Sequence, residues 1–197
     1  MLPFVLPFLA YVFIPLVLQP FSPIIGQIAK LIVVAGLVFH YRKNYKLKLL
    51  LSPLGIAAGV LIAVIWIALE GHYPYFLGTP DIIPTDIPYL AMRFLNSILL
   101  APVIEEFFTR YFLNRIIQEK DWKKVPIYRF TAASFIITAL FFGLSHSRWL
   151  PGIITGIILN LLLIKTKKLE ECIIAHATAN LALGIYVIST HSWIFWG

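Results

Sequence analysis

The stretch Ala101–Leu113, APVIEEFFTRYFL, places three ionisable side chains within six residues of an apolar run. The run extends from about Ile87 to Ile117. A charge at the bilayer centre costs about 2.5–3.5 kcal/mol, so Glu105, Glu106 and Arg110 together cost about 8–10 kcal/mol if they stay unpaired. A membrane chain keeps such a cluster only where the charges pair, face a wet cavity or carry chemistry. We expect all three here.

The composition is that of an integral membrane protein. The 197 residues are 60% hydrophobic and 13% charged, with a mean hydropathy of +0.87. Soluble domains are about one quarter charged. The length suits one compact bundle, so we expect a single transmembrane domain over residues 1–197. Cys172 is the one cysteine, which excludes an internal disulfide and a cysteine metal cluster.

Seven apolar runs approach the roughly 20 residues that a helix needs to cross the hydrocarbon core. The expected fold class is all-α, a single bundle of about seven transmembrane helices, with six to eight possible. Residues 87–96 are expected at the interface, with a bend at Pro102, and the sixth run is short enough to be buried or to cross incompletely. The first run lacks a basic segment before it, which favours a retained span over a signal peptide. The predicted spans are Leu2–Leu18, Pro23–His40, Leu49–Leu69, Ile87–Gln118, Ile127–Leu144, Leu150–Ile164 and Cys172–Ser189.

The formal charge of +7 is explained by membrane orientation. Eleven of the sixteen cations fall in alternate loops, at residues 42–48, 120–129 and 165–168. The loop between the third and fourth spans carries acids and no cation, and we expect it to be solvated. By the positive-inside rule the N-terminus is cytoplasmic and the C-terminus is outside. No nucleic-acid partner is expected. The acids of that loop are Glu70, Asp81 and Asp86.

The two adjacent glutamates are predicted to differ. Glu106 and Arg110 are four residues apart, share one helix face and can form an ion pair. Glu105 points about 100° away, beside Thr109, and has no obvious cation. One carboxylate is therefore neutralised, and the other is available.

Polar side chains on two further spans extend this cluster. His176 and Asn180 project together from one face, and Phe142 precedes His146 by one turn, as an apolar wall beside its ring. Each feature alone is explained by helix packing or by an interfacial position. Together they supply a base, a second group that positions water, and two oxyanion donors. Asn160, on a ridge with Gly152 and Gly156, needs a partner for its amide in lipid.

Three motifs follow one another in the chain: Glu105-Glu106-x-x-x-Arg110, Phe142-x-x-x-His146 and His176-x-x-x-Asn180. In order and spacing they resemble the motifs of the CPBP family, also called ABI. That family includes the type II CAAX prenyl endopeptidases and bacterial relatives. The motif-bearing core covers about residues 101–183.

The resemblance implies an intramembrane glutamate endopeptidase that uses no metal and no cofactor. Its substrate would be a membrane-anchored protein or peptide. Carried over by position, Glu105 is the general base assisted by His146, and His176 with Asn180 binds the oxyanion. Glu106 and Arg110 would be a supporting pair, and the candidate neighbours of the site are Thr109, Phe142 and Asn160.

A finer similarity concerns the substrate. Prenylated cysteine is a eukaryotic modification, whereas this short chain resembles prokaryotic relatives linked to C-terminal protein sorting. The resemblance rests on Ser145–Trp149 followed by the glycine ridge. It implies a multi-pass protein of the prokaryotic cytoplasmic membrane that cleaves near an anchored C-terminal region.

The predicted topology sets a geometric condition on this site. Glu105 and His146 lie toward the outer side, whereas His176 starts near the cytoplasmic side. These side chains meet only if the seventh span begins deep or the sixth does not cross fully. A cavity that opens outward is expected.

Two other classes of function remain compatible with the residues. A zinc hydrolase could use His146, His176 and Glu105 as ligands, although the His-Glu-x-x-His motif is absent. A non-enzymatic chain could use the same charges as a proton relay in a small transporter. It could also be a catalytically silent partner or an immunity protein.

Overall fold

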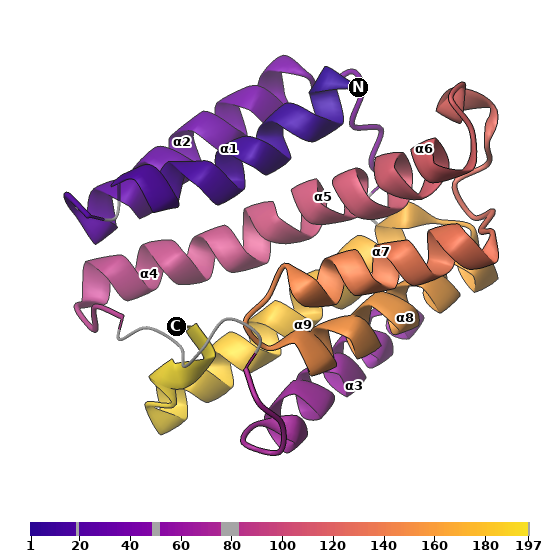
Figure 1. The fold of residues 1–197 in the computed structure, drawn as a ribbon. Helices are drawn as coiled ribbons and strands as arrows, with labels where there is room; N and C mark the ends of the chain where they lie inside the picture. Colours follow the sequence, from indigo (N-terminus) through magenta and orange to yellow (C-terminus); the bar gives the residue numbers. More distant parts are fainter. Residues whose placement is uncertain (19, 49–51, 76–82, 197) are drawn as a thin grey trace.

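The computed structural model describes residues 1–18, 20–48, 52–75 and 83–196. Regular structure within these residues is entirely helical, which confirms the all-α class (Figure 1). Counting Ile87–Gln118 as one helix, the described residues form seven helices of the predicted order, besides two short 3₁₀ turns. The helices are α1 Leu2–Leu18, α2 Pro23–His40, α3 Pro53–Leu69, α4 to α6 within Ile87–Gln118, α7 Ala132–Leu144, α8 Trp149–Thr166 and α9 Leu169–Thr190.

Four of these helices are long and apolar enough to cross a membrane. They are α2, the continuous helix 87–118, α8 and α9, while α1, α3 and α7 are shorter apolar helices. The third span begins at Pro53 behind the cap residue Ser52, whose side chain accepts from the Gly55 amide. The predicted residues Leu49–Leu51 lie outside the described part of the chain.

The fifth span, and not the sixth, is the short one. Thr131 and Ser134 form a capping box, so α7 starts at Ala132 and has 13 residues. The predicted start at Ile127 is therefore wrong, because the capping box fixes the first turn after a non-helical segment. The sixth span extends over 18 residues as α8, beyond the predicted Leu150–Ile164.

The helix 87–118 runs through the middle of the molecule without the predicted bend. It consists of α4 Ile87–Leu95, α5 Ala101–Glu106 and α6 Asn114–Gln118, joined by π-helical turns over Asn96–Leu100 and Phe107–Leu113. The three segments follow one axis (Figure 1). The π-helical turn before Pro102 accommodates its missing N–H without a kink. Residues 87–96 are thus continuous with the rest of this helix.

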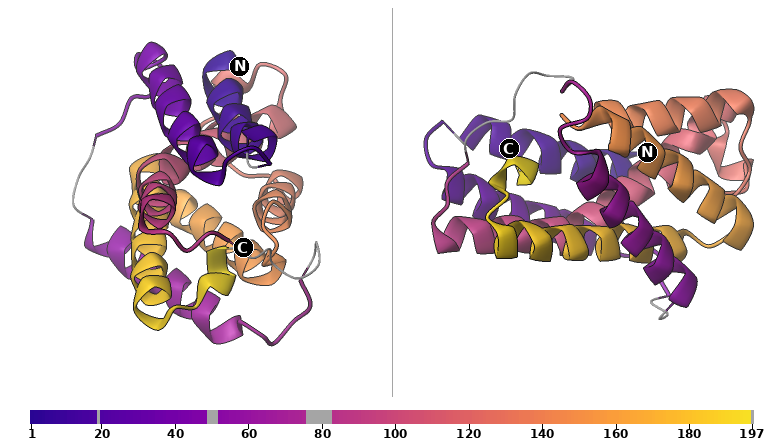
Figure 2. Two further views of the ribbon diagram at one scale, coloured as in Figure 1. Left: turned by 90° about the vertical axis from the view of Figure 1, so that its left-hand side faces the viewer. Right: turned by 90° about the horizontal axis from the view of Figure 1, so that it is seen from below.

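The remaining helices pack on two sides of this axis. The α1–α2 hairpin covers one side, and α3, α8 and α9 lie on the other with α7 beside them (Figure 2). The predicted glycine ridges make the close approaches. A Cβ at Gly59 would lie 2.6 Å from Thr178 Cβ on α9, and one at Gly156 would lie 2.8 Å from Ala139 Cα on α7.

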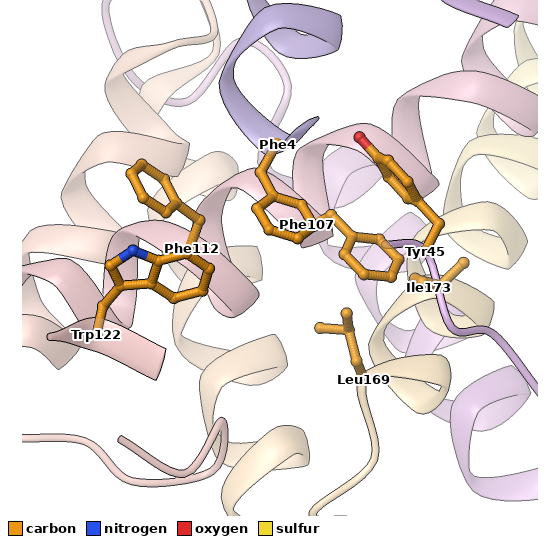
Figure 3. Packing of buried hydrophobic residues seen from close by; sticks show 7 residues of the cluster. All are labelled: Phe4, Tyr45, Phe107, Phe112, Trp122, Leu169 and Ile173. Atoms are coloured by element: carbon orange, nitrogen blue, oxygen red, sulfur yellow. The ribbon is translucent and has the colours of Figure 1, made fainter. Parts of the chain in front are cut away.

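An aromatic cluster fastens the α1–α2 hairpin to the central helix at the end where α6 lies (Figure 3). Phe4 stacks on Phe107 with ring centroids 5.9 Å apart, and the Tyr45 hydroxyl donates to the Pro3 carbonyl at 2.6 Å. This packing holds α1 against the segment that follows the two glutamates. The buried members are Phe4, Tyr45, Phe107, Phe112, Trp122, Leu169 and Ile173.

Candidate active site

One cavity of about 170 Å³ collects the side chains that the sequence singles out for chemistry. It lies between the central helix, the turn after α7, and α9. The side chains that line it include Glu105, His146, His176 and Asn180. Residues separated by up to 75 positions in the chain are thus brought to one space.

Glu106 is completely buried and binds two partners through one oxygen. Its Oε1 accepts from Arg110 Nη1 at 3.2 Å, which is the predicted ion pair. The same oxygen lies 3.0 Å from His176 Nδ1, a contact that the sequence did not predict. Because a carboxylate only accepts, Nδ1 carries the proton. Glu106 therefore orients His176 directly, in addition to pairing with Arg110.

Arg110 is equally buried and touches two other elements. Its Nη2 donates to the Gly156 carbonyl of α8 at 3.4 Å. Its Cζ lies 4.5 Å from the centroid of the Phe142 ring, within cation–π range. The guanidinium thereby joins the central helix to α7 and α8 at the depth of the cavity.

Glu105 differs from its neighbour as predicted. Its side chain is half-buried, lines the cavity, and has neither a hydrogen bond nor an ion pair with the residues that the structure describes. Thr109, predicted beside it, is buried and does not belong to the lining. The Glu105 carboxylate is left free to accept a proton or a hydrogen bond from a molecule in the cavity.

His146 presents its second ring nitrogen as an acceptor. Its Nδ1 lies 2.7 Å from the Phe142 carbonyl oxygen, which can only accept, so Nδ1 is the donor. In the neutral ring Nε2 then carries a lone pair. Trp66 of α3 packs edge-on against the imidazole at a centroid distance of 5.7 Å.

The short α7 explains how His146 reaches the other groups. Thirteen residues of helix span about 20 Å, well short of the roughly 30 Å hydrocarbon core. The turn after α7 therefore lies beside the middle of the central helix, near α5 (Figure 1), and α5 carries Glu105. Glu105, His146 and His176 thus line one cavity in a fold whose short helix is the fifth, whereas the sequence indicated a short sixth or a deep seventh span.

Asn180 is held by a carbonyl that the central helix leaves unpaired. Its Nδ2 donates to the Ser97 carbonyl at 2.7 Å. In the π-helical turn the Ala101 amide bonds to Asn96, five residues back, so the next amide would reach Ser97. That next residue is Pro102, which has no N–H. One amide proton of Asn180 takes the place of this missing N–H, and the other remains available to donate to a molecule in the cavity.

Phe142 lines the cavity as predicted, and its ring contacts both histidines, with centroid distances of 5.1 Å to His146 and 5.5 Å to His176. Asn160 lies elsewhere. Its Nδ2 donates to Thr138 Oγ1 at 2.9 Å, an interhelical bond between α8 and α7. The amide nitrogen of Asn160 is thus bonded in helix packing, and the residue is not among the side chains that line the cavity.

The turn that carries His146 is anchored by Arg148. The Arg148 Nε lies 2.7 Å from Glu70 Oε2, and its Nη2 donates to the Ile194 carbonyl. Tyr75 donates to Glu70 as well, and this hydrogen bond raises the pKa of the Tyr75 hydroxyl. The prediction of a solvated Glu70 is therefore wrong, because Arg148 draws it into an ion pair in which the Glu70 side chain is only 16% exposed.

The same prediction of solvation covered the other two acids of that loop. Asp86 accepts from the Tyr89 amide at 3.0 Å and caps α4. Asp81 lies outside the described residues.

Trp196 also belongs to the site, although the sequence analysis did not select it. It is 7% exposed and lines the cavity with Phe195. The two arginines that donate to the turn Trp193–Trp196, Arg148 to Ile194 and Arg93 to Trp196, hold it inward. Long-range contacts of this kind leave no local sequence signal.

A second cavity of about 320 Å³ meets the first at Glu105 and His146. Two cations line it, Lys30 from α2 and Arg93 from α4, which the sequence analysis did not select. The signal was present, since Lys30 interrupts an apolar run just as the glutamates do. Among the described residues, no three His, Cys, Asp or Glu side chains are placed to share a metal ion.

Comparison with known proteins assigns the region that carries these residues. The family model for type II CAAX prenyl endopeptidase Rce1-like proteins matches residues 87–182. All three motifs lie within the match. No curated protein and no solved structure matches the chain. Residues 87–182 are thus an Rce1-like domain of the type II CAAX prenyl endopeptidase (CPBP) family.

Proposed function

We propose that this chain is a metal-independent intramembrane endopeptidase that hydrolyses a peptide bond near the membrane-anchored C-terminal region of a protein. The family implies an intramembrane protease and a protein substrate. The observation that carries the finer proposal is the placement of Glu105, His146, His176 and Asn180 around one cavity.

Glu105 and His146 activate water in this mechanism. The Glu105 carboxylate has no partner among the described residues, and His146 presents the lone pair of Nε2. A water held between them loses a proton to Glu105 as its oxygen attacks the scissile carbonyl. The same proton then passes to the departing amine nitrogen, so one water is consumed and two termini form.

His176 and Asn180 stabilise the negative charge that develops on the carbonyl oxygen. Asn180 contributes the amide proton that does not bond to Ser97. His176 contributes Nε2–H when its ring carries both protons, while Nδ1–H donates to Glu106 and fixes the orientation of the ring. Oxyanion donors in a site that excludes water contribute about 2.7–4 kcal/mol each to the barrier.

The proposed orientation keeps the N-terminus in the cytoplasm and the C-terminus outside. The N-terminus and α6 lie toward one end of the molecule, and the C-terminus lies near α4 at the other (Figure 1). The basic segments 42–48, 120–129 and 165–168 alternate along the chain with the acidic loop. A multi-pass protein of a prokaryotic cytoplasmic membrane, with a single domain over residues 1–197, fits this arrangement.

The decisive experiment compares protein termini in membranes of cells that express the natural chain or Glu105→Gln. New C-termini that depend on Glu105 identify a substrate, and a peptide spanning that site is then cleaved by purified protein in liposomes. Reaction in H₂¹⁸O labels the new carboxylate if the step is hydrolysis. Glu119→Gln, an exposed glutamate after α6, is the matched control and should keep full activity.

Two results would contradict the proposal. The first is cleavage that survives Glu105→Gln in folded protein. The second is activity that a chelator removes and zinc restores, which would favour the metal hydrolase. Proton-coupled flux in liposomes without any cleavage would favour the transporter.

A further inference from the structure

Lys30 is a buried cation in the middle of an apolar helix. It lies in α2, which contains no acidic residue, and is 7% exposed. An ammonium group in such a place is costly unless it pairs or faces a wet cavity. Within the described residues it has neither a hydrogen bond nor an ion pair, and its contact is with the Tyr11 ring, 4.2 Å from Nζ to the centroid.

Arg93 faces the same cavity from the central helix. Its Nη1 donates to the Tyr89 hydroxyl at 3.3 Å, and its Nη2 donates to the Trp196 carbonyl. Both partners are neutral, so the guanidinium charge is unmatched in the part of the chain that the structure describes. Two cations from different helices therefore line one cavity of about 320 Å³.

This cavity is in direct contact with the proposed catalytic centre. Glu105 and His146 line both cavities, and so do Ser97 and Trp196. Any occupant of the larger cavity thus touches the side chains that we assign to water activation. A bound lipid headgroup would obstruct that centre, whereas a peptide substrate extending from it would not.

We infer that Lys30 and Arg93 bind a carboxylate of the peptide substrate. The inference rests on the proposed function, because it takes the occupant of the Glu105 cavity to be a peptide. An ammonium and a guanidinium form charge-assisted hydrogen bonds with carboxylate oxygens. Their two positive charges also outnumber the single negative charge of Glu105, which is the one acid among the described residues that line this cavity.

The spacing along the central helix sets the length of the recognised segment. Arg93 and Glu105 are twelve residues apart, which corresponds to about 18 Å of helix. The side chains of Arg93 and Glu105 both line the larger cavity, so the distance between their charged groups can be shorter than this. Extended peptide covers about 3.3 Å per residue, so the carboxylate lies roughly three to five residues from the scissile bond. Its source is either the C-terminus of the peptide or an acidic side chain.

The test measures binding separately from turnover. Three fluorescent peptides share one apolar sequence and carry a C-terminal carboxylate, a C-terminal amide, or a C-terminal amide with one aspartate near the end. Anisotropy is recorded with the full-length Glu105→Gln protein in neutral detergent. At least one carboxylate peptide should bind about tenfold more tightly than the plain amide peptide. Comparing the two carboxylate peptides identifies the source.

Substitutions of Lys30 then locate the effect. Lys30→Met should remove the preference for carboxylate, and Lys30→Arg should retain most of it. Lys165→Met makes the same change on an exposed lysine at the end of α8 and should leave the preference intact. Thermal unfolding of each variant in detergent verifies that the protein is folded.

Three outcomes overturn the inference: equal binding of all three peptides, a preference that survives Lys30→Met, or Lys30-dependent binding of phosphatidylglycerol in mixed micelles with no peptide preference. Failure of the proposed function is distinguishable from these. Carboxylate-dependent binding without Glu105-dependent cleavage supports the anion site and overturns only the protease. Glu105-dependent cleavage without a carboxylate preference overturns only the anion site.

Discussion

His176 donates from Nδ1 to Oε1 of Glu106 across 3.0 Å, and this contact links α9 to the central helix. Arg110 shares the same oxygen. The second glutamate of the pair therefore controls the position of a proposed oxyanion donor while it neutralises a buried cation. Glu106 has two partners and Glu105 has none among the described residues, so their substitutions should have separable effects.

Glu105→Gln should abolish turnover and leave the protein folded. The amide fills the same space, and the carboxylate that it replaces makes no hydrogen bond or ion pair with the described residues. Cleavage of the identified peptide and thermal unfolding in detergent check the two parts. A variant that loses both activity and several degrees of melting temperature would contradict the assignment of Glu105 as an unpaired base.

Glu106→Gln should damage both stability and activity. It leaves Arg110 buried without a counter-charge, a change that typically costs about 3–5 kcal/mol. It also weakens the hydrogen bond that orients His176. The comparison with Glu105→Gln under identical conditions is the control, since the chemical change is the same. Equal behaviour of the two variants would show that the proposed division between them is wrong.

Asn180→Ala should lower the cleavage rate by about 10²–10³-fold, the usual effect of losing one oxyanion donor. It also leaves the Ser97 carbonyl without its donor, at a cost of about 1–3 kcal/mol in stability. The cleavage rate at saturating peptide is divided by the amount of folded protein, which is measured independently. This ratio separates the loss of catalysis from the loss of stability. Activity close to that of the natural chain would remove Asn180 from the mechanism.

Arg148→Met should act on His146 from a distance. The substitution leaves Glu70 without its cation and frees the turn before α8, so we expect a loss of about 3–5 kcal/mol in stability. Activity should fall more than folded protein does, since the His146 turn loses its anchor. Arg129→Met, on an exposed arginine before α7, is the control and should change neither quantity.

The helices could be predicted because run length and hydropathy are local properties. Residues Leu2–Leu18 and Pro23–His40 form helices with the predicted bounds. The start of α7 was wrong because Thr131 and Ser134 form a cap that hydropathy does not reveal. Side-chain caps also precede α3 and α4, at Ser52 and Asp86.

The candidate site was predictable in its members and not in its contacts. Glu105, His146, His176 and Asn180 could be selected because polar groups in lipid are expensive. The pairing of Glu106 with His176 depends on how α9 packs against the central helix, which no spacing in the sequence reports. Lys30 could have been found by the same cost argument that identified the glutamates.

Because of the π-helical turn Asn96–Leu100, the alignment of the site depends more on the number of residues in this turn than on their type. Each residue added to or removed from a helix rotates everything beyond it by about 100°. Exchanging Leu99, which is 56% exposed, for another apolar residue should therefore be tolerated. Deleting it would turn Ser97 and the two glutamates out of phase, so that the amide of Asn180 and the base of the reaction would no longer share one face.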